Sequence, residues 1–216
     1  MRKIALIVAG GKGARMNSSI PKQFLLLNNI PILIHTINAF SDLDEILLVL
    51  PKEQFNYWNQ LCLKYNLNIP HTIIAGGESR FDSVKNGLDE ICNESIVLIH
   101  DGVRPFISKK IIAELINTVK KKVGVVPVIK LKDSIRKISN DSTKPISRED
   151  LYKIQTPQCF LSTEIKTAYQ QVSSKEFTDD ASVFESISGT ILPIMGEERN
   201  LKITTKEDLE IANSLI

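Results

Sequence analysis

Features of membrane, secreted and nucleic-acid-binding proteins are scarce in this sequence of 216 residues. Its formal net charge is only +2, its three cysteines lie far apart, and it contains no long apolar segment. So small a charge gives no reason to expect nucleic acid as a partner. An odd number of distant cysteines indicates reduced thiols rather than disulfides, and the cysteines do not have the spacing of metal ligands. The chain starts on a short strand without a leader pattern. We therefore expect a cytoplasmic protein that binds neither nucleic acid nor a membrane.

Two common phosphate-binding patterns are also missing, although the first apolar run ends in glycines. Residues 4–9 are apolar, and Gly10, Gly11 and Gly13 follow them. A P-loop needs four residues between its glycines and then Gly-Lys-Ser/Thr, which this loop does not supply. The dinucleotide fingerprint needs a glycine where Met16 stands, and no acidic residue ends the second strand. Both interpretations are therefore disfavoured.

The same loop does contain glycines and fixed cations in a pattern that suits a polyanion. Glycines after a buried strand let backbone N–H groups approach a phosphate closely. Arg15 lies inside the loop and Lys22 just beyond it. Because a loop that only binds rarely needs both cations, we expect a reaction at a phosphate. An ordinary strand-to-helix turn with solvated basic residues is the simpler alternative.

Apolar strands and amphipathic helices alternate along the first part of the chain. Strands are expected at residues 4–9, 45–50, 72–75, 95–99 and 123–127, and helices at 31–40, 52–65, 79–91 and 109–121. Such alternation predicts an α/β fold with a mostly parallel sheet, helices on both faces and ligands beyond the carboxyl ends of the strands. We expect one domain over residues 1–216.

The alternation breaks between residues 130 and 158. Polar alternating segments around 134–137 and 146–154 flank a turn-rich stretch at 139–142 and predict a β-hairpin too polar for the core. An isolated hairpin is only marginally stable, so it should lean on another surface, most simply on a second copy of the chain. Further elements are expected at residues 162–171, 179–187, 190–193 and 206–216.

Two other strands of the expected sheet end in polar motifs. Gly77, Ser79 and Arg80 follow the third strand, where a turn with an N-cap explains the glycine and the serine but not the arginine. Asp101 ends the fourth strand, where a carboxylate facing the first loop could hold a divalent cation with nucleotide phosphates. Arg104 could then reach a second anionic substrate.

Three further polar residues have simpler explanations beside a functional one. His100 could satisfy a backbone carbonyl rather than take part in catalysis, and Asp179 is a suitable N-cap for the next helix. Lys202 lies between two apolar residues. It could point inward beside a phosphate site or outward into solvent, and the sequence leaves both possibilities open.

Taken in order, these segments resemble the 2-C-methyl-D-erythritol 4-phosphate cytidylyltransferases of the non-mevalonate isoprenoid pathway. The matching segments lie at residues 9–16, 21–24, 76–84, 100–105, 155–158, 178–179 and 200–204. The resemblance implies a Rossmann-like nucleotidyltransferase fold and a homodimer held by an exchanged hairpin arm at about residues 132–156. It also implies an Mg²⁺-dependent reaction of CTP with methylerythritol phosphate that gives a cytidine diphosphate alcohol and pyrophosphate.

The resemblance assigns roles to individual residues. Arg15 and Lys22 match the cations that stabilise charge on the α-phosphate and the departing pyrophosphate, while Lys202 and Arg148 of the partner subunit match those that orient the acceptor phosphate. The implied nucleotide-binding residues are Ala9, Gly10, Gly11, Gly77, Arg80, Ser83 and Gly102. The implied acceptor-binding residues are Asp101, Arg104, Ser134, Arg148 and Lys202, with Asp101 also at the metal.

Three alternatives to this function stay open at the level of sequence. Ribitol 5-phosphate cytidylyltransferases share the first loop and the motifs at 21–23 and 155–158, although residues 82–84 and 181–182 look more like the methylerythritol enzyme. A nucleotide-binding protein without turnover would bind CTP and release no pyrophosphate. A sugar-phosphate nucleotidyltransferase would use another base. Arg199 stands where many family members have an acid, so we assign no second carboxylate to the metal.

Overall fold

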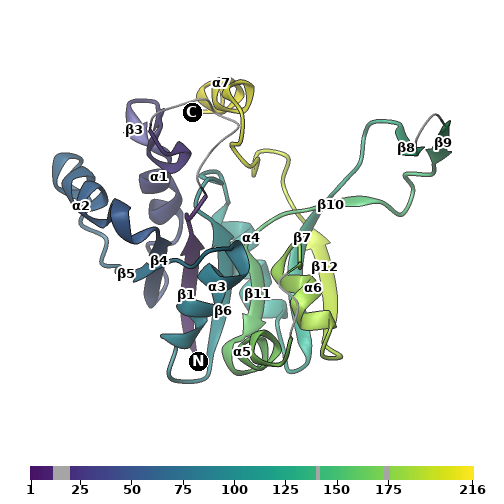
Figure 1. Cartoon of the computed structure of the whole chain (residues 1–216), viewed down its shortest axis with the longest axis horizontal. Coiled ribbons are helices and arrows are strands. Elements are labelled where there is room, and N and C mark those ends of the chain that lie inside the picture. The colour runs from purple at the N-terminus through teal and green to yellow at the C-terminus, as the bar shows by residue number, and fades with distance from the viewer. Residues whose placement is uncertain (12–19, 140–141, 173–175) are drawn as a thin grey trace.

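The computed structural model describes residues 1–11, 20–139, 142–172 and 176–216. One eight-stranded sheet runs through the body, in the order β10-β7-β11-β6-β1-β4-β5, with β12 also paired to β7 (Figure 1). The strands of this sheet are β1 (Arg2–Val8), β4 (Glu45–Leu50), β5 (Thr72–Ala75), β6 (Ser95–Asp101), β7 (Val123–Lys130), β10 (Tyr152–Ile154), β11 (Gln158–Leu161) and β12 (Thr190–Met195).

The central strands are parallel and buried. β1 lies between β4 and β6 and pairs in parallel with both, and β5 continues the parallel set beside β4. Ile4 to Ile7 and Ile46 to Leu50 are at most 3% exposed. Because both faces of these strands are covered, their apolar runs are continuous rather than alternating. The predicted α/β class with a mostly parallel sheet is confirmed.

One strand inside the sheet was not predicted. β11 runs antiparallel between β6 and β7, with Cys159 opposite Leu98 on one side and Val125 on the other. Its first residue, Gln158, closes the polar segment at 155–158, and only three apolar residues follow before Ser162, so the sequence shows no separate apolar run there. β11 is only four residues long and all of them are buried, so its sequence has no hydrophobic periodicity from which the strand could be predicted.

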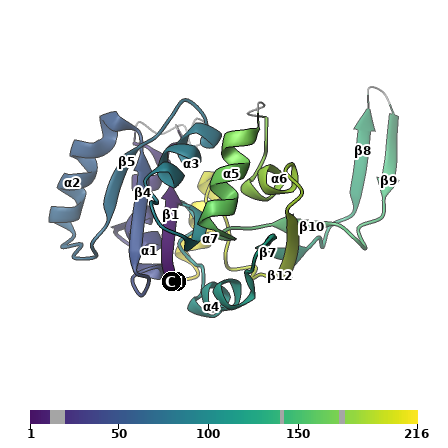
Figure 2. The same ribbon diagram turned by 90° about the horizontal axis from the view of Figure 1, so that it is seen from below.

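Helices cover both faces of the sheet (Figure 2). One face packs against α1 (Ile32–Ala39), α2 (Phe55–Lys64) and α4 (Lys109–Thr118), and the other against α3 (Arg80–Asp89), α5 (Ser162–Gln171) and α6 (Asp180–Glu185). A third apolar cluster joins α7 (Lys206–Asn213) to the small β2 (Leu26–Leu27) and β3 (Ile30–Pro31) pair. Single turns, η2 (Lys22–Phe24) and η3 (Lys52–Gln54), lie near the carboxyl ends of β1 and β4.

A hairpin arm projects from the body at the far end of β7 (Figures 1 and 2). Its strands are β8 (Ile135–Ser139) and β9 (Ser142–Ile146), and nearly all of their residues are exposed, as predicted for a hairpin too polar for the core. The second strand was expected at 146–154, but it begins at Ser142. Pro145 lies inside β9, and a proline argues against a strand from sequence alone. The residues at 152–154 instead form β10, which pairs with β7.

The three cysteines, Cys62, Cys92 and Cys159, are all free thiols. Within the residues that the structure describes, none of the helices combines the length and the hydropathy that crossing a bilayer demands.

Candidate active site

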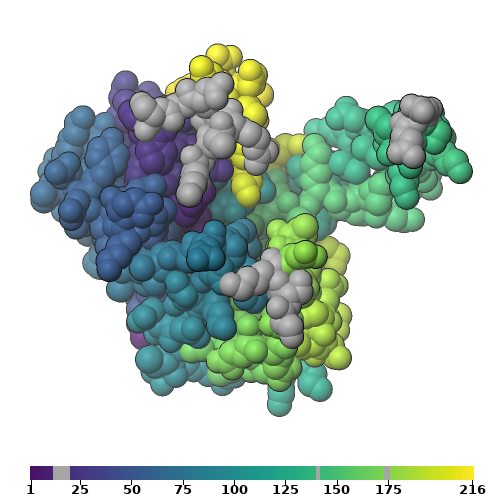
Figure 3. All heavy atoms as spheres, in the orientation of Figure 1, coloured from purple at the N-terminus to yellow at the C-terminus, as the bar shows by residue number. Residues whose placement is uncertain are grey.

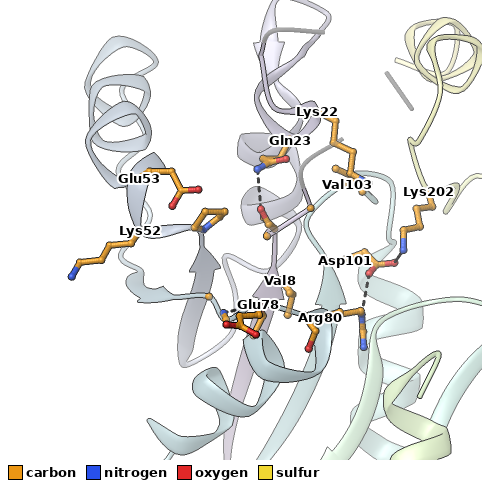
Figure 4. Close-up of a pocket in the computed structure, with 18 residues that line it drawn as sticks. Val8, Lys22, Gln23, Lys52, Glu53, Glu78, Arg80, Asp101, Val103 and Lys202 are labelled. Atoms are coloured by element: carbon orange, nitrogen blue, oxygen red, sulfur yellow. Dashed lines mark hydrogen bonds and ion pairs between the residues drawn. The ribbon is translucent and has the colours of Figure 1, made fainter. Parts of the chain in front are cut away.

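A pocket of about 720 Å³ opens at the carboxyl edge of the parallel strands. Among the residues predicted from the sequence, those lining it are Ala9, Gly10, Gly11, Lys22, Gly77, Arg80, Ser83, Asp101 and Lys202 (Figure 4). They come from the carboxyl ends of β1 and β6, from η2, from the loop after β5 and the first turns of α3, and from the loop before α7. Parallel strands bring their carboxyl ends to one edge, so motifs far apart in sequence meet there.

The glycine loops are held together by Ser83 on α3. The Gly77 N–H donates to Ser83 Oγ at 3.1 Å, and the Ser83 hydroxyl also lies 3.5 Å from where a Cβ on Gly10 would stand. A Cβ on Gly77 would come within 2.3 Å of the Cβ of Asp82, so only glycine fits. Ser79 is the N-cap of α3, as the simpler explanation expected, because its hydroxyl accepts the Asp82 N–H at 3.1 Å.

Lys22 lies over the first glycine loop. Its Cε is 3.4 Å from where a Cβ on Gly11 would stand, and its side chain lines the pocket. The next residue, Gln23, is completely buried, and its Nε2 donates to the Ala9 carbonyl at 2.9 Å and to Gln54 Oε1 at 2.8 Å. Gln23 thus ties the lysine turn to the glycine loop. Its polar type within the Pro-Lys-Gln-Phe motif was a signal that the sequence analysis did not use.

Asp101 is surrounded by cations at the carboxyl end of β6. Lys202 Nζ lies 3.0 Å and Arg104 Nε 3.1 Å from Oδ2, and Arg80 Nε lies 3.9 Å from Oδ1. Burial alone would raise the pKa of this carboxyl, but the charges of Lys202, Arg80 and Arg104 hold it well below its usual range. Asp101 is therefore ionised at neutral pH. Of the two positions left open for Lys202, the structure has the inward one.

Arg80 is fixed in place by a buried acid that the sequence analysis did not assign. Its guanidinium forms two hydrogen bonds, of 2.8 and 2.7 Å, with the carboxylate of Asp180, which is completely buried. The Tyr169 hydroxyl donates to Asp180 at 2.6 Å. Burial opposes the charge of Arg80, but Asp180 raises the pKa of the guanidinium above its ordinary value. Burial and Asp180 also raise the pKa of Tyr169.

The start of α6, which carries Asp180, is held by two motif residues. Asp179 is the N-cap, because its Oδ1 accepts the Ser182 N–H at 3.1 Å. Gln158 donates to Asp179 Oδ2 at 2.9 Å and accepts the Ala181 N–H at 2.7 Å. The capping explanation of Asp179 is confirmed. The cap and Gln158 together place Asp180 against Arg80.

His100 has the structural role that the simpler explanation gave it. It is completely buried, and its Nε2 is 3.0 Å from the Arg104 carbonyl while its Nδ1 is 3.0 Å from Thr156 Oγ1. The same Thr156 oxygen accepts the Asp101 N–H at 3.0 Å. Burial lowers the pKa of His100 to about 4, so the ring is neutral at pH 7.

Several predicted site residues lie away from the pocket lining. Gly102 packs behind the site, where a Cβ would come within 2.7 Å of the Ala9 Cβ, and Arg104 Nη1 donates to the Asn200 carbonyl at 2.7 Å. Ser134 and Arg148 belong to the arm, which stands clear of the body of the same chain (Figure 3). Arg148 donates to the Lys132 carbonyl there.

Arg15 lies outside the described residues. Within the part of the chain that the structure describes, one pocket thus contains Lys22, Arg80 and Lys202 beside backbone N–H groups of glycine loops. Fixed cations and N–H groups of this kind bind polyphosphates and stabilise charge that develops on them.

The residues present fit a magnesium ion that is held mainly by a substrate. Among the described residues, no group of three or more His, Cys, Asp or Glu side chains could hold a metal by itself. Mg²⁺ in nucleotide-dependent enzymes, however, often needs only one or two carboxylates in addition to the phosphates. Among the described residues, Asp101 Oδ2 contacts Lys202 and Arg104, whereas the contact of Oδ1 is the longer one with Arg80. Asp101 Oδ1 is therefore the candidate ligand.

Known proteins resemble the chain over its full length. The family model described as 2-C-methyl-D-erythritol 4-phosphate cytidylyltransferase matches residues 3–216. The enzyme of that name from Azobacteroides pseudotrichonymphae is 47% identical over 221 residues, with 100% of this chain and 99% of the relative covered. The one from Bacteroides fragilis is 44% identical over 219 residues, with 100% of both covered.

Solved structures agree with the sequence relatives. The 4-diphosphocytidyl-2C-methyl-D-erythritol synthase of Anaerococcus prevotii superposes with a TM-score of 0.84 at 32% identity, covering 99% of this chain and 95% of that one. The 2-C-methyl-D-erythritol 4-phosphate cytidylyltransferase of Thermus thermophilus gives 0.84 at 27% identity, covering 100% and 98%. The fold is thus the one expected from the resemblance, and the chain belongs to the 2-C-methyl-D-erythritol 4-phosphate cytidylyltransferase family.

Proposed function

We propose that the chain transfers the cytidylyl group of CTP to 2-C-methyl-D-erythritol 4-phosphate, giving 4-diphosphocytidyl-2-C-methyl-D-erythritol and pyrophosphate in isoprenoid precursor biosynthesis. The observation that carries this conclusion is the family match over residues 3–216. The cation-lined pocket at the carboxyl edge of the sheet is the kind of site that the reaction requires. The relatives from Azobacteroides and Bacteroides carry the methylerythritol name, which favours this acceptor over ribitol 5-phosphate.

The reaction is a substitution at the α-phosphate of CTP. A phosphate oxygen of the acceptor forms a new bond to the α-phosphorus, and the bond between the α-phosphorus and the oxygen that bridges it to the β-phosphate breaks. The electron pair of that bond leaves with pyrophosphate. The attacking oxygen is already anionic, so no general base has to remove a proton. The catalytic demand is therefore to bring two anions together and to stabilise the departing charge.

Two groups of cations can meet that demand. Lys22 lies over the glycine loop and, with Arg15, would stabilise charge on the α-phosphate and on pyrophosphate. Lys202 lies beside Asp101 at the carboxyl end of β6, where it would orient the acceptor phosphate (Figure 4). Ala9 to Gly11, Gly77 and Ser83 would hold the cytidine, since bare backbone groups and one hydroxyl suit a small pyrimidine pocket.

Magnesium would be held by Asp101 together with the phosphates of CTP. When bound, it would neutralise phosphate charge and favour the departure of pyrophosphate. A single carboxylate in this position agrees with Arg199 standing where many family members have an acid. We propose Mg²⁺ on the chemistry of this donor set.

We also propose that the enzyme acts as a homodimer whose arms are exchanged. The arm carries Ser134 and Arg148 away from the pocket of its own chain, so these residues can serve a pocket only if that pocket belongs to another copy. Exposed apolar side chains on the arm and beside it support a protein partner, since Ile138 is 73% and Tyr152 43% exposed.

The cytoplasm, where thiols stay reduced, suits the free cysteines.

The test is pyrophosphate release from CTP and Mg²⁺, measured in parallel with methylerythritol 4-phosphate and ribitol 5-phosphate as acceptors. Release with the first acceptor alone is expected. Release with ribitol 5-phosphate alone would contradict the proposed acceptor but keep the chemistry. Binding of CTP without release in either reaction would favour a nucleotide-binding protein, and faster turnover with UTP or GTP would indicate another base.

A further inference from the structure

Lys202 lies on an irregular loop, yet the residues on both sides of it, Asn200 and Ile203, are held by hydrogen bonds. Residues 201–204 belong to no helix or strand, and the Lys202 side chain is 40% exposed. On one side of it, the Asn200 carbonyl accepts Arg104 Nη1 at 2.7 Å. On the other side, the Ile203 N–H donates to the Val103 carbonyl at 3.0 Å, and Ile203 is completely buried. The backbone of Lys202 is thus tied at both ends to the segment that follows Asp101.

Asn200 contributes a second tie through its side chain. The residue is completely buried, and its Nδ2 donates to the Thr156 carbonyl at 2.8 Å. Thr156 in turn accepts the Asp101 N–H through its hydroxyl. Thr156 is therefore bonded to Asp101 directly and to Asn200, which lies two residues before Lys202 in the chain. Neither Thr156 nor Asn200 is among the residues that line the pocket.

Gln155 forms further hydrogen bonds with the loop that carries Lys202. Its Nε2 donates to the carbonyls of Glu197 and Asn200 at 2.8 and 3.2 Å, and its Oε1 accepts the Glu197 N–H at 3.3 Å. A Cβ on Gly196 would come within 2.4 Å of Gln155 Oε1, so the loop closes on the amide without room for a larger residue. Gln155 is 3% exposed.

The unused oxygen of Asn200 shows which half of its amide matters. Oδ1 is buried and, among the described residues, has no hydrogen-bond partner. A buried acceptor without a partner costs stability, and an apolar residue of similar size would avoid that cost. Turning the amide over would leave Nδ2 without a partner and set Oδ1 against the Thr156 carbonyl. The side chain is therefore explained by the donor that it offers to Thr156.

From these contacts we infer that Asn200 and Gln155 are positioning residues for catalysis, which hold Lys202 against Asp101 before the acceptor phosphate arrives. The inference rests on the proposed function, because it takes Lys202 as the cation that orients the acceptor. It explains the first residues of the Gln-Thr-Pro-Gln and Asn-Leu-Lys motifs, Gln155 and Asn200. Neither residue lines the pocket. Loss of the hydrogen bonds of Asn200 and Gln155 would leave Lys202 in the chain but no longer held beside Asp101.

The kinetic test uses Asn200→Ala and Gln155→Met, with Asn213→Ala as a matched control. Asn213 also donates through Nδ2 to a backbone carbonyl, that of Leu209 at 2.9 Å, but it is exposed on α7. A misplaced positioning group can cost on the order of a hundredfold, so kcat/KM for the acceptor should fall about tenfold to a hundredfold. The Kd for CTP alone should change less than about twofold, since Lys202 acts on the acceptor.

A double-mutant cycle separates positioning from a general loss of structure. In the Lys202→Ala background, adding Asn200→Ala should lower kcat/KM by less than about threefold further, because residues that act as a unit are not additive. Full multiplication of the two losses, or an equal loss in Asn213→Ala, would overturn the inference. So would an equal fall in affinity for CTP.

A readout without turnover keeps the inference separate from the proposed function. Brief acetylation followed by peptide mass spectrometry measures how readily Lys202 reacts, with exposed Lys110 as the internal reference. An ammonium held against a carboxylate reacts slowly, so Asn200→Ala should raise the Lys202 rate several-fold. Wild-type protein that releases no pyrophosphate would refute the proposed function, while the labelling would still decide the positioning. An unchanged labelling rate in Asn200→Ala and Gln155→Met would overturn it.

Discussion

The buried ring of His100 allows a direct check of the network behind the active site. Its Nε2 faces the Arg104 carbonyl, which only accepts hydrogen bonds, so Nε2 must carry the proton. Nδ1 then accepts from the Thr156 hydroxyl, and that hydroxyl oxygen accepts the Asp101 N–H. Burial, which lowers the pKa of His100, keeps the ring neutral, and the Arg104 carbonyl defines the tautomer of that neutral ring.

The same burial predicts how stability depends on pH. The pKa of His100 falls from the ordinary 6.5 to about 4 in the folded protein. Below pH 6.5 the unfolded chain therefore binds a proton that the folded chain does not, and stability is lost as the pH falls toward 4. Between pH 7 and 5 this single group should lower the free energy of unfolding by about 2 kcal/mol.

Nitrogen NMR of the imidazoles and urea unfolding test the two parts of this prediction. The chain has three histidines, so the ring signals can be assigned with single substitutions. At pH 5 the His100 ring should still be neutral with its proton on Nε2. Between pH 7 and 5, wild-type protein should lose about 2 kcal/mol more than His100→Gln does. A proton on Nδ1, protonation near pH 6.5, or equal pH dependence in the variant would refute the reasoning.

Four further predictions follow from the contacts at the site. Lys22→Ala should lower kcat on the order of a hundredfold while the melting temperature stays close to that of wild type, with Lys110→Ala as the control; an unchanged kcat would remove the role given to Lys22. Tyr169→Phe should cost about 1.5–3 kcal/mol of unfolding free energy, because the buried carboxylate of Asp180 loses a hydrogen-bond donor. Tyr57→Phe, on an exposed ring, should cost less than about 0.5 kcal/mol in the same chemical denaturation, and equal effects would count against the role given to the Tyr169–Asp180 hydrogen bond. Mixing Arg148→Ala with Arg15→Ala protein should restore part of the activity if each pocket borrows an arm, and a mixture as inactive as its components would contradict a shared site. In a thiol-reagent assay, exposed Cys92 should react at once and Cys159 only after unfolding, because Cys159 is completely buried and burial raises its pKa; early reaction of Cys159 would contradict this packing.

The parallel core could be read from the sequence because its signal is local. β4 and β5 begin and end where their apolar runs do, at Glu45–Leu50 and Thr72–Ala75. β4, which is buried on both faces, needs such a run, and the polar or turn-forming residues on either side of each run mark where the strand ends. Since parallel strands end on the same edge, the positions of Gly77, Asp101 and the first glycine loop followed directly.

The partners of the site residues could not be read in this way. Asp180 pairs with Arg80 from 100 residues away, and sequence alone gave it no more than a place beside a helix cap. Gln23 and Asn200 each donate to a backbone carbonyl, of Ala9 and of Thr156, and a backbone carbonyl has no side-chain signature in the sequence. β11 was hidden because its four residues are too short for a periodicity, and β9 because it contains Pro145.

A carboxylate amid the cations of a phosphate pocket has a physical purpose. Without Asp101, the charges of Lys202, Arg104 and Arg80 would repel one another, and Lys202, whose side chain is 40% exposed, would turn toward solvent until a substrate arrived. With it, Lys202 and Arg104 already lie within 3.0 and 3.1 Å of one oxygen. Cations that are in place beforehand need no reorganisation when charge develops on the transferred phosphate, which is the main source of electrostatic catalysis.

The two halves of the pocket are held by different parts of the chain. Gln23 ties the Lys22 turn to the loop after β1, whereas Asp101 and Asn200 tie Lys202 to the ends of β6 and β10. No hydrogen bond among the described contacts of Gln23 reaches the Lys202 loop. Damage to one anchor should therefore leave the opposite cation in place. If Lys22 acts on the nucleotide and Lys202 on the acceptor, as we propose, the two sides of the reaction can be weakened separately, which a pocket built on a single loop would not allow.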